Sequence, residues 1–363
     1  MRGLIELEPL DTVFFGDARG MELNIGGRSL SIPLPWTVSG ALLSHYLLRT
    51  GKYGDVMRGC KNVNGECESE EKGEATVFAF YGPFLHFKDS FKDRYWFSPP
   101  ADLVRDGGKV GLIRFKVCGS GYAQQLPSVY LPPDAEPYGM LVDHEFLNCY
   151  ANGKITEPRS EDHFDHEERR VGIHIDDSKR AVKTGYTFSC VHRRPRFGLR
   201  YAVLIWEKEK RDFNFSGILR LGGEGRVAKV SERGLEEVGG RFSWLDNREL
   251  EAGNYVKVVL LSPAIYRSRD RDVRAPDHQM LQKLPGKPEL LMTVGGRAIM
   301  VSGWNMRAKR ARKMYAAVPP GTVYYFKLNE KVDRLDLTLS FWKLSLFWER
   351  GFGSPLVAVG GVV

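Results

Sequence analysis

The chain consists of short apolar strand segments separated by glycine and proline, with one clear amphipathic helix. The helix is expected over about Pro35–Arg49, because Val38, Leu42 and Tyr46 recur at four-residue spacing. A short second helix is expected over residues 213–221. The strands do not alternate strictly with helices, which favours an α+β fold with antiparallel sheets. Strands are expected over residues 4–15, 76–87, 95–97, 199–206, 226–230, 255–261, 298–301, 322–327 and 337–347.

A chain of 363 residues is long enough for two domains of roughly 100–200 residues each. The polar stretch over residues 231–253 has no clear hydrophobic period, so the boundary is placed there. We expect an N-terminal domain over residues 1–235 and a C-terminal domain over residues 236–363. Two acidic stretches of the first domain, residues 51–76 and 157–168, are expected to be surface loops.

The composition limits which binding partners and which cellular compartment are expected. A net charge of +8 favours an acidic partner such as nucleic acid, although many basic proteins bind none. The five cysteines are scattered and form no CxxC pair, which argues against a disulfide framework and fits a reducing cytosol. No apolar run approaches the roughly 18 residues of a membrane span, and the first residues predict a strand rather than a signal peptide. A cytoplasmic protein without a membrane partner is expected.

Histidines are the first candidates for catalysis or metal binding. His163, His166 and His174 lie close together in sequence, but in a highly charged stretch that is more typical of a solvated loop than of a metal site. His45 lies on the apolar helix, where an interior role is favoured over general-base catalysis. The sequence contains no H-E-x-x-H, G-x-S-x-G or Walker A motif. We therefore expect no catalytic residue, no metal and no cofactor.

Two glycine-rich segments stand apart from the other turns. Residues 222–226 join a predicted helix to a strand, and Gly351-Phe352-Gly353 follow Arg350. Backbone without side chains allows a phosphate or a ribose to approach main-chain N–H groups. Structural turns are an equally good interpretation of each segment taken alone.

Three basic clusters carry the strongest functional signal. They occupy residues 192–200, 266–274 and 304–315, and the first and third contain no acid. Arginine and lysine neutralise phosphates, and the interleaved aromatic residues can stack on unpaired bases. The third cluster also has helical spacing, so an amphipathic helix with a solvated basic face remains the alternative. Together the clusters make RNA binding as good an interpretation as a solvated surface.

Six segments, in order, resemble the family of the third subunit of the Cmr complex, the type III-B CRISPR effector, within the RAMP superfamily of RNA-binding proteins. They are residues 7–15, 33–41, 171–188, 221–226, 318–326 and 351–353. The resemblance implies two ferredoxin-like (RRM-like) domains with inserted loops, an inserted hairpin at residues 171–196, and a glycine-rich loop near the C-terminus. It also implies a non-catalytic subunit that grips the 5′ handle of CRISPR RNA and docks on the large polymerase/cyclase-like subunit. The backbone RAMP subunits would be further partners, and target RNA would be met indirectly.

The chain departs from the family pattern at two places, so RNA contacts there are doubtful. Gly16 and Asp17 precede the nearest basic residue, Arg19, and leucines replace an expected arginine in the first helix. From the clusters and the resemblance together, the expected RNA-binding residues are Arg19, Lys179, Arg180, Lys183, Arg193, Arg194, Arg196, Arg226, Arg267, Arg307, Lys309, Arg310, Arg350, Gly351, Phe352 and Gly353.

Three alternatives remain open. The first is a RAMP-type endoribonuclease that processes CRISPR RNA, with His45 as its one candidate base. The second is the equivalent handle-binding subunit of a type III-A complex. The third is an interaction subunit that contacts no RNA.

Overall fold

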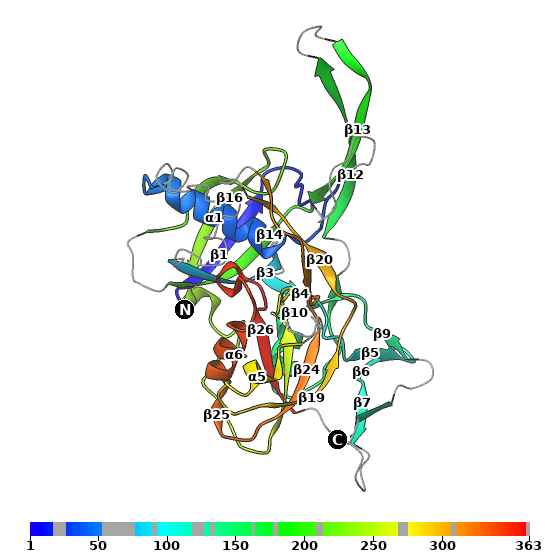
Figure 1. Ribbon diagram of the computed structural model, residues 1–363, viewed down its shortest axis with the longest axis vertical. Helices are drawn as coiled ribbons and strands as arrows, with labels where there is room; N and C mark the ends of the chain where they lie inside the picture. Colours follow the sequence, from blue (N-terminus) through cyan, green and yellow to red (C-terminus); the bar gives the residue numbers. More distant parts are fainter. Residues whose placement is uncertain are drawn as a thin grey trace. The chain divides into compact units, whose positions relative to one another are not determined.

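The computed structural model describes residues 1–16, 27–52, 77–88, 93–117, 127–130, 135–161, 164–176, 181–207, 213–267, 275–305 and 310–360 (Figure 1). The chain divides into two compact units. The first unit comprises Met1–Asp93, His163–Arg233 and Met300–Tyr315, and the second comprises Arg94–Asp162, Gly234–Ile299 and Ala316–Val363. One junction, between Arg233 and Gly234, lies beside the boundary expected at residue 235. Residues 94–162 belong to the second unit, however, and residues 300–315 to the first.

The first unit is built on an antiparallel sheet in which β14 and β1 are central. The strands are β3 (Phe78–Lys88), β14 (Leu199–Glu207), β1 (Gly3–Pro9), β16 (Val227–Gly234) and β15 (Gly217–Arg220), adjacent in that order. β14 pairs with β1 on one side and with β3 on the other. Most residues of these three strands are buried, because the pleat is covered on both faces.

Helix α1 (Pro35–Arg49) covers part of this sheet and confirms the sequence prediction. Proline occupies the first turn, where its missing N–H would have no intrahelical acceptor. Val38, Leu42 and Tyr46 are buried, and the Tyr46 ring meets the Phe78 ring of β3 edge-on at 5.1 Å between centroids. The amphipathic period therefore identified the packed face correctly.

A long two-stranded ribbon belongs to the first unit. β12 (Asp165–Asp176) pairs antiparallel with β13 (Ala181–Pro195), and β2 (Gly27–Arg28) pairs in parallel with β13 at its base. Figure 1 shows the ribbon, drawn in green, extending beyond the sheet of this unit. Two short strands of the same unit, β21 (Trp304–Asn305) and β22 (Arg310–Ala311), pair antiparallel. The hairpin expected from the family resemblance is therefore present.

The second unit has a four-stranded antiparallel sheet, β19 (Glu289–Val294), β24 (Val323–Lys327), β18 (Tyr255–Leu260) and β26 (Pro355–Val359), in that order. Helix α6 (Arg334–Trp342) packs beside it, and Phe341 and Leu337 join its apolar core. Among the described residues, the other helices are α3 (His144–Ala151), α4 (Leu235–Val238), α5 (His278–Leu281) and the 3-10 helix η2 (Trp348–Arg350). The remaining strands are β4 (Asp93–Phe97), β5 (Leu103–Asp106), β6 (Lys109–Leu112), β7 (Arg114–Val117), β8 (Pro127–Tyr130), β9 (Glu136–Pro137), β10 (Leu141–Asp143), β11 (Ser160–Glu161), β17 (Glu249–Leu250), β20 (Ile299–Val301), β23 (Tyr315–Ala317) and β25 (Val332–Asp333).

A buried ion pair lies in the core of the second unit. The Nζ atom of Lys257 lies 2.9 Å from the Oδ2 atom of Asp102. The hydroxyls of Tyr150 and Tyr325 also donate to this carboxylate, at 2.9 and 2.6 Å from Oδ2. The ammonium additionally faces both tyrosine rings, at 4.8 and 5.2 Å from their centroids. The carboxylate and the ammonium are thus buried inside the unit, where they pair with each other and contact the two tyrosines.

The expectation of a mixed α+β protein with antiparallel sheets and few helices is confirmed. Three local predictions were wrong. Residues 337–347, expected as a strand, lie largely in α6, whose N-terminus is capped by the Asp333 side chain. Residues 213–221, expected as a helix, contain strand β15, and part of the acidic stretch expected as a loop forms the start of β12. No helix among the described residues is long and apolar enough to cross a membrane.

Candidate nucleic-acid interface

The first basic cluster lies on β13, and its partner strand β12 places acids opposite it. The guanidinium of Arg193 lies 3.4 Å from an Asp165 carboxylate oxygen and 3.0 Å from one of Glu167. Its Nε–H also donates to the carbonyl of Ser29 at 3.3 Å. The acids are absent from the local sequence around Arg193, yet the antiparallel register brings them to it. A phosphate would have to compete with these carboxylates for the Arg193 side chain.

Asp11 extends this pattern beyond the end of β1. Its carboxylate oxygens lie 3.3 Å from Arg194, 2.9 Å from Arg226 and 3.7 Å from Arg170. The backbone N–H of Thr12, followed by the nearby guanidinium groups, holds the pKa of Asp11 below its usual value. The Asp11 carboxylate therefore gathers three arginines at the base of the ribbon, and two of them, Arg194 and Arg226, were expected RNA ligands.

The glycine-rich turn at residues 222–225 lies against Phe14. Gly222 has φ +79°, and a Cβ atom there would lie 2.5 Å from the Phe14 carbonyl oxygen. The N–H of Gly223 donates to the same carbonyl at 2.8 Å. Glycine is required here for close approach of two backbone segments, so the structural-turn interpretation accounts for it.

Three buried polar atoms around the Asp11–Phe14 segment have no hydrogen-bond partner among the described residues. They are Thr12 Oγ1, His192 Nδ1 and Arg226 Nε. The His192 ring lies 5.2 Å from the Phe14 ring, and burial, followed by the charge of Arg226, lowers the pKa of His192. A neutral imidazole, a hydroxyl and a guanidinium N–H thus remain available to a polar molecule that reaches this place.

A second surface of the first unit combines aromatic rings with cations. We call it the Trp36 patch, and it consists of Trp36, Arg312, Lys313 and Tyr315. The ring centroids of Trp36 and Tyr315 lie 6.0 Å apart. The guanidinium carbon of Arg312 lies 5.6 Å from the Trp36 centroid, and the Lys313 ammonium lies 5.7 Å from that of Tyr315. Aromatic faces beside cations are suited to stacking unpaired bases while neutralising their phosphates.

Local structure explains why these residues meet. Trp36 stands in the first turn of α1, outside the apolar face defined by Val38 and Leu42. The Arg312 N–H donates to the carbonyl of Gly303 at 2.8 Å, which joins the two ends of residues 303–312. A Cβ atom at Gly303 would be 3.8 Å from the Trp36 ring. The sequence interpretation missed Trp36; its signal was a large aromatic beside a helix-starting proline but off the packed face.

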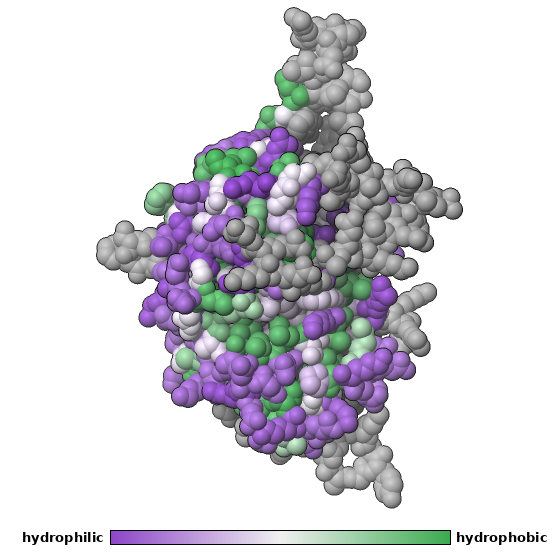
Figure 2. Space-filling view, turned by 90° about the vertical axis from the view of Figure 1, so that its left-hand side faces the viewer, coloured by the Kyte–Doolittle hydropathy of each residue, from purple (hydrophilic) through white to green (hydrophobic). Residues whose placement is uncertain are grey.

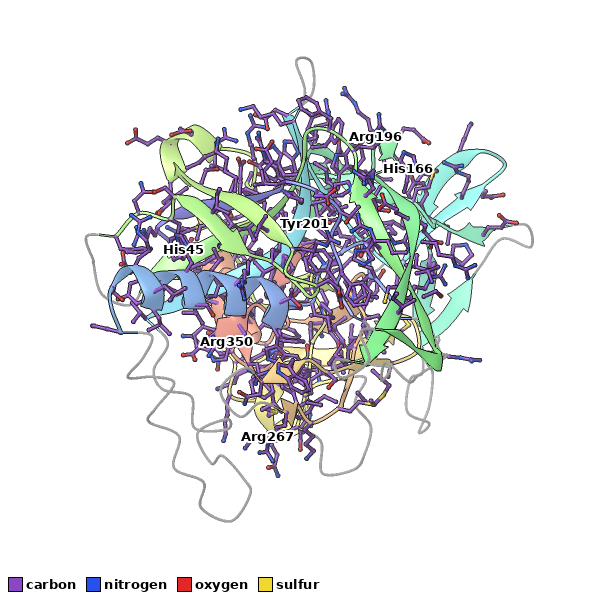
Figure 3. All side chains as sticks on the ribbon, turned by 90° about the horizontal axis from the view of Figure 1, so that it is seen from above. His45, His166, Arg196, Tyr201, Arg267 and Arg350 are labelled. Carbon is purple, nitrogen blue, oxygen red and sulfur yellow. The ribbon has the colours of Figure 1, made fainter. Side chains whose placement is uncertain are left out.

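Arg196 and Phe197 follow directly after β13. Figure 3 shows Arg196 near His166 in the first unit, and the Arg196 N–H donates to the carbonyl of Phe164 at 2.9 Å. The Arg196 guanidinium carbon lies 5.4 Å from the Phe87 centroid, and Phe197 is 93% exposed. An exposed phenylalanine next to an arginine is a combination suited to stacking an unpaired base.

The other expected ligands are distributed as follows. Arg267 and Arg310 are described and exposed, Arg267 in the second unit and Arg310 on β22 of the first. Lys183 is on β13, but its side chain is not among those that the structure describes. Arg19, Lys179, Arg180, Arg307 and Lys309 lie outside the described residues.

The C-terminal glycine segment is packed inside the second unit. Phe352 is 0% exposed, and the indole N–H of Trp342 donates to its carbonyl at 3.1 Å. Gly353 has φ +72°, and a Cβ atom there would lie 2.5 Å from the Cβ of Ser345. Gly351 also has a positive φ, of +104°, and follows the half-buried Arg350 at the end of η2. This geometry favours the structural-turn interpretation over direct contact of RNA with Gly351, Phe352 and Gly353.

His45 is tied into the first unit. Its Nε2 atom lies 3.0 Å from the carbonyl oxygen of Ser216, and its side chain is buried. Burial lowers the pKa of His45 below its usual value. Among the described residues, no group of three or more His, Cys, Asp or Glu side chains is placed to hold a metal ion. His163 lies outside these residues, and the histidine interpretation at that position is not tested.

Comparison with known proteins gives a family and a fold. No curated protein matches the chain in sequence. One solved structure, described as "Cryo-EM structure of the Type III-B Cmr-beta bound to cognate target RNA and AMPPnP, state 1", contains a chain with 16% identity and a TM-score of 0.50. The match covers 89% of this chain and 86% of that one. A second, described as "Cryo-EM structure of the Type III-B Cmr-beta bound to cognate target RNA", gives 17% identity and a TM-score of 0.49 over the same shares. At such identity, the first match shows a shared fold.

The sequence model described as "CRISPR-associated protein (Cas_Cmr3)" matches residues 5–359, nearly the whole chain. The match includes both units, the ribbon and the Trp36 patch. The chain therefore belongs to the Cas_Cmr3 family of CRISPR-associated proteins.

Proposed function

We propose that this chain is a non-catalytic, RNA-binding subunit of a type III-B CRISPR effector complex, where it holds the 5′ handle of CRISPR RNA. Membership of the Cas_Cmr3 family supports a place in such a complex. In this proposal the chain docks on the large polymerase/cyclase-like subunit and on backbone RAMP subunits. Target RNA is met only indirectly, and the two units correspond to two ferredoxin-like folds.

The observation that carries RNA binding is the Trp36 patch. The rings of Trp36 and Tyr315 lie beside the cations of Arg312 and Lys313. Sequence-tolerant binding of single-stranded RNA uses this combination of ring faces and cations. The arginines on β13 contribute less in this proposal, because carboxylates already neutralise them.

The first test measures binding of a fluorescent RNA carrying the repeat-derived handle. Trp36→Leu and Tyr315→Leu keep apolar volume but remove the stacking faces. Stacking is worth about 1–3 kcal/mol per base, so each change should weaken binding by roughly 5- to 150-fold. A matched control is Lys331→Gln, which removes a surface cation that pairs with Glu249 in the second unit. Equal affinities for all variants would contradict the proposal.

Salt dependence separates phosphate contacts from stacking. The Arg312→Gln and Lys313→Gln changes should each reduce the slope of log K against log salt by about 0.7, the single-strand value per phosphate. Trp36→Leu should lower affinity with an unchanged slope. A slope that Arg312→Gln leaves unchanged would mean that its guanidinium only supports the Trp36 ring.

The nuclease alternative is tested on the same samples. In this proposal the protein leaves a repeat RNA uncut, with or without divalent metal. Cleavage that disappears in His45→Ala would establish the RAMP-type endoribonuclease instead. If the chain bound no RNA at all, it would be a pure interaction subunit.

A further inference from the structure

An open groove of about 290 Å³ lies between α5 and α6 in the second unit. Figure 1 shows the two helices next to each other. Six residues line the groove: Met280, Lys283, Leu284, Ser340, Lys343 and Leu344. Each of the two sides contributes one lysine and at least one aliphatic side chain. The groove lies wholly within the second unit, and the Trp36 patch belongs to the first.

Local structure fixes the apolar floor. The Asp277 side chain caps the four-residue helix α5 by accepting from the Gln279 N–H, and the chain then turns so that Leu284 is almost fully buried. Leu284 belongs to the core of the second unit, and Leu344 packs against that core while staying partly exposed. Met280 is likewise only half-buried. The floor therefore offers aliphatic surface that continues the core outward.

The rim of the groove is positive. Lys283 and Lys343 are exposed, and neither forms an ion pair with a carboxylate of the described residues. Lys343 faces the Trp348 ring, at 6.0 Å from its centroid. Two other exposed lysines of this unit are paired, Lys287 with Glu330 and Lys331 with Glu249, whereas Lys154 and Lys327 are exposed and, like the groove lysines, form no ion pair with a described residue. The nearest acid along α6 is the exposed Asp336, one turn before Ser340 and outside the lining.

We propose that the α5–α6 groove docks an acidic amphipathic segment of a partner polypeptide. Apolar side chains of that segment would cover Met280, Leu284 and Leu344, and its carboxylates would pair with Lys283 and Lys343. The aliphatic floor has no aromatic face for a base, which favours a polypeptide over RNA. Figure 2 views the side on which α6 lies and shows hydrophobic residues bordered by hydrophilic ones on this face. The inference rests on the proposed function only in assuming that the chain works within a protein assembly.

The experiment places a photo-crosslinking benzoylphenylalanine at Ser340 in the assembled complex. We expect a crosslink, mapped by mass spectrometry, to a partner segment in which Asp or Glu flank apolar residues. A crosslink to RNA, to a second copy, or to the acidic residues 66–74 of the same chain would overturn the proposal, as would no crosslink at all.

Charge reversal tests the lysines independently. The double change Lys283→Glu and Lys343→Glu should weaken association with the partner at least tenfold, more strongly at low salt than at high salt. The matched control, Lys154→Glu with Lys327→Glu, reverses two exposed lysines of the same unit that lie outside the groove and form no ion pair with a described residue, and it should change association little. Handle-RNA affinity of the groove variant should be unchanged. If the wild-type protein did not bind handle RNA, the proposed function would be refuted. If the groove variant assembled normally, only this inference would be refuted.

Discussion

The buried pair of Asp102 and Lys257 gives a sharp stability prediction. Lys257→Met removes the ammonium and leaves a fully buried carboxylate with the two tyrosine hydroxyls as donors. Removing one partner of a buried ion pair typically costs about 3–5 kcal/mol, because the remaining charge loses its compensation. Asp102→Asn should cost a similar amount, since the ammonium would then keep only the Tyr150 and Tyr325 rings and an uncharged amide.

The double replacement separates the pair from its surroundings. Asp102→Asn combined with Lys257→Met removes both charges, so it should cost less than the sum of the two single changes, by at least about 1 kcal/mol. Tyr325→Phe serves as a smaller perturbation and should cost about 1.5–3 kcal/mol, the value of one hydrogen bond to a charged group.

The assay is urea unfolding of the full chain, with hydrogen exchange of β18 amides as a local probe of the second unit. Local exchange is needed because a chain of two units need not unfold in one step. Single changes that cost less than 1 kcal/mol, or strictly additive costs in the double variant, would refute the reasoning.

Three further predictions concern other parts of the chain. Burial lowers the pKa of His144 to about 4, so the neutral imidazole contributes its full share to the free energy of unfolding above pH 6.5. That contribution should fall by at most about 3 kcal/mol as the pH drops toward 4. Urea unfolding midpoints should lose this part of their pH dependence in His144→Gln. Gly353→Leu should lower stability by about 1–3 kcal/mol through strain against Ser345, with unchanged RNA affinity of the folded protein, and an affinity loss at unchanged melting temperature would restore the RNA-loop hypothesis. Asp11→Asn should release Arg194 and Arg226, strengthen RNA binding and steepen its salt slope by up to about 0.7 per new phosphate contact; weaker binding would show that Asp11 positions these arginines for RNA.

Sequence patterns predicted the elements whose signals are local. α1 was predictable because its apolar period and its proline agree. The strand prediction over residues 337–347 was wrong because Leu335, Leu337 and Leu339 alternate with polar residues as in a strand. Asp333, just before them, caps a helix instead. A capping aspartate was the available signal for the helix.

The site was less predictable because its electrostatics depend on pairing between distant segments. The sequence around Arg193 and Arg194 contains no acid, yet β12 and the end of β1 supply Glu167, Glu168 and Asp11. Clusters read along the chain therefore overestimate the free positive charge of the ribbon. The contact between Trp36 and Tyr315 likewise joins residues that are 279 positions apart in the sequence, and a single sequence gives no sign of it.

Among the described residues, backbone pairing attaches the ribbon formed by β12 and β13 to the rest of the first unit near its base, where β2 pairs with Cys190 and Val191 and where Val13 bridges Arg193. Val171 and Ser189 face each other directly across the ribbon, above these attachments. The chain can therefore be cut at this pair and closed with a two-residue Asn-Gly turn, which suits antiparallel strands. Such a shortened protein would keep the sheet and the Asp11 ion pairs while losing all reach beyond the base. The ribbon can thus be shortened without removing the sheet that carries it. Assembly of the shortened protein can then be measured separately from the folding of the first unit.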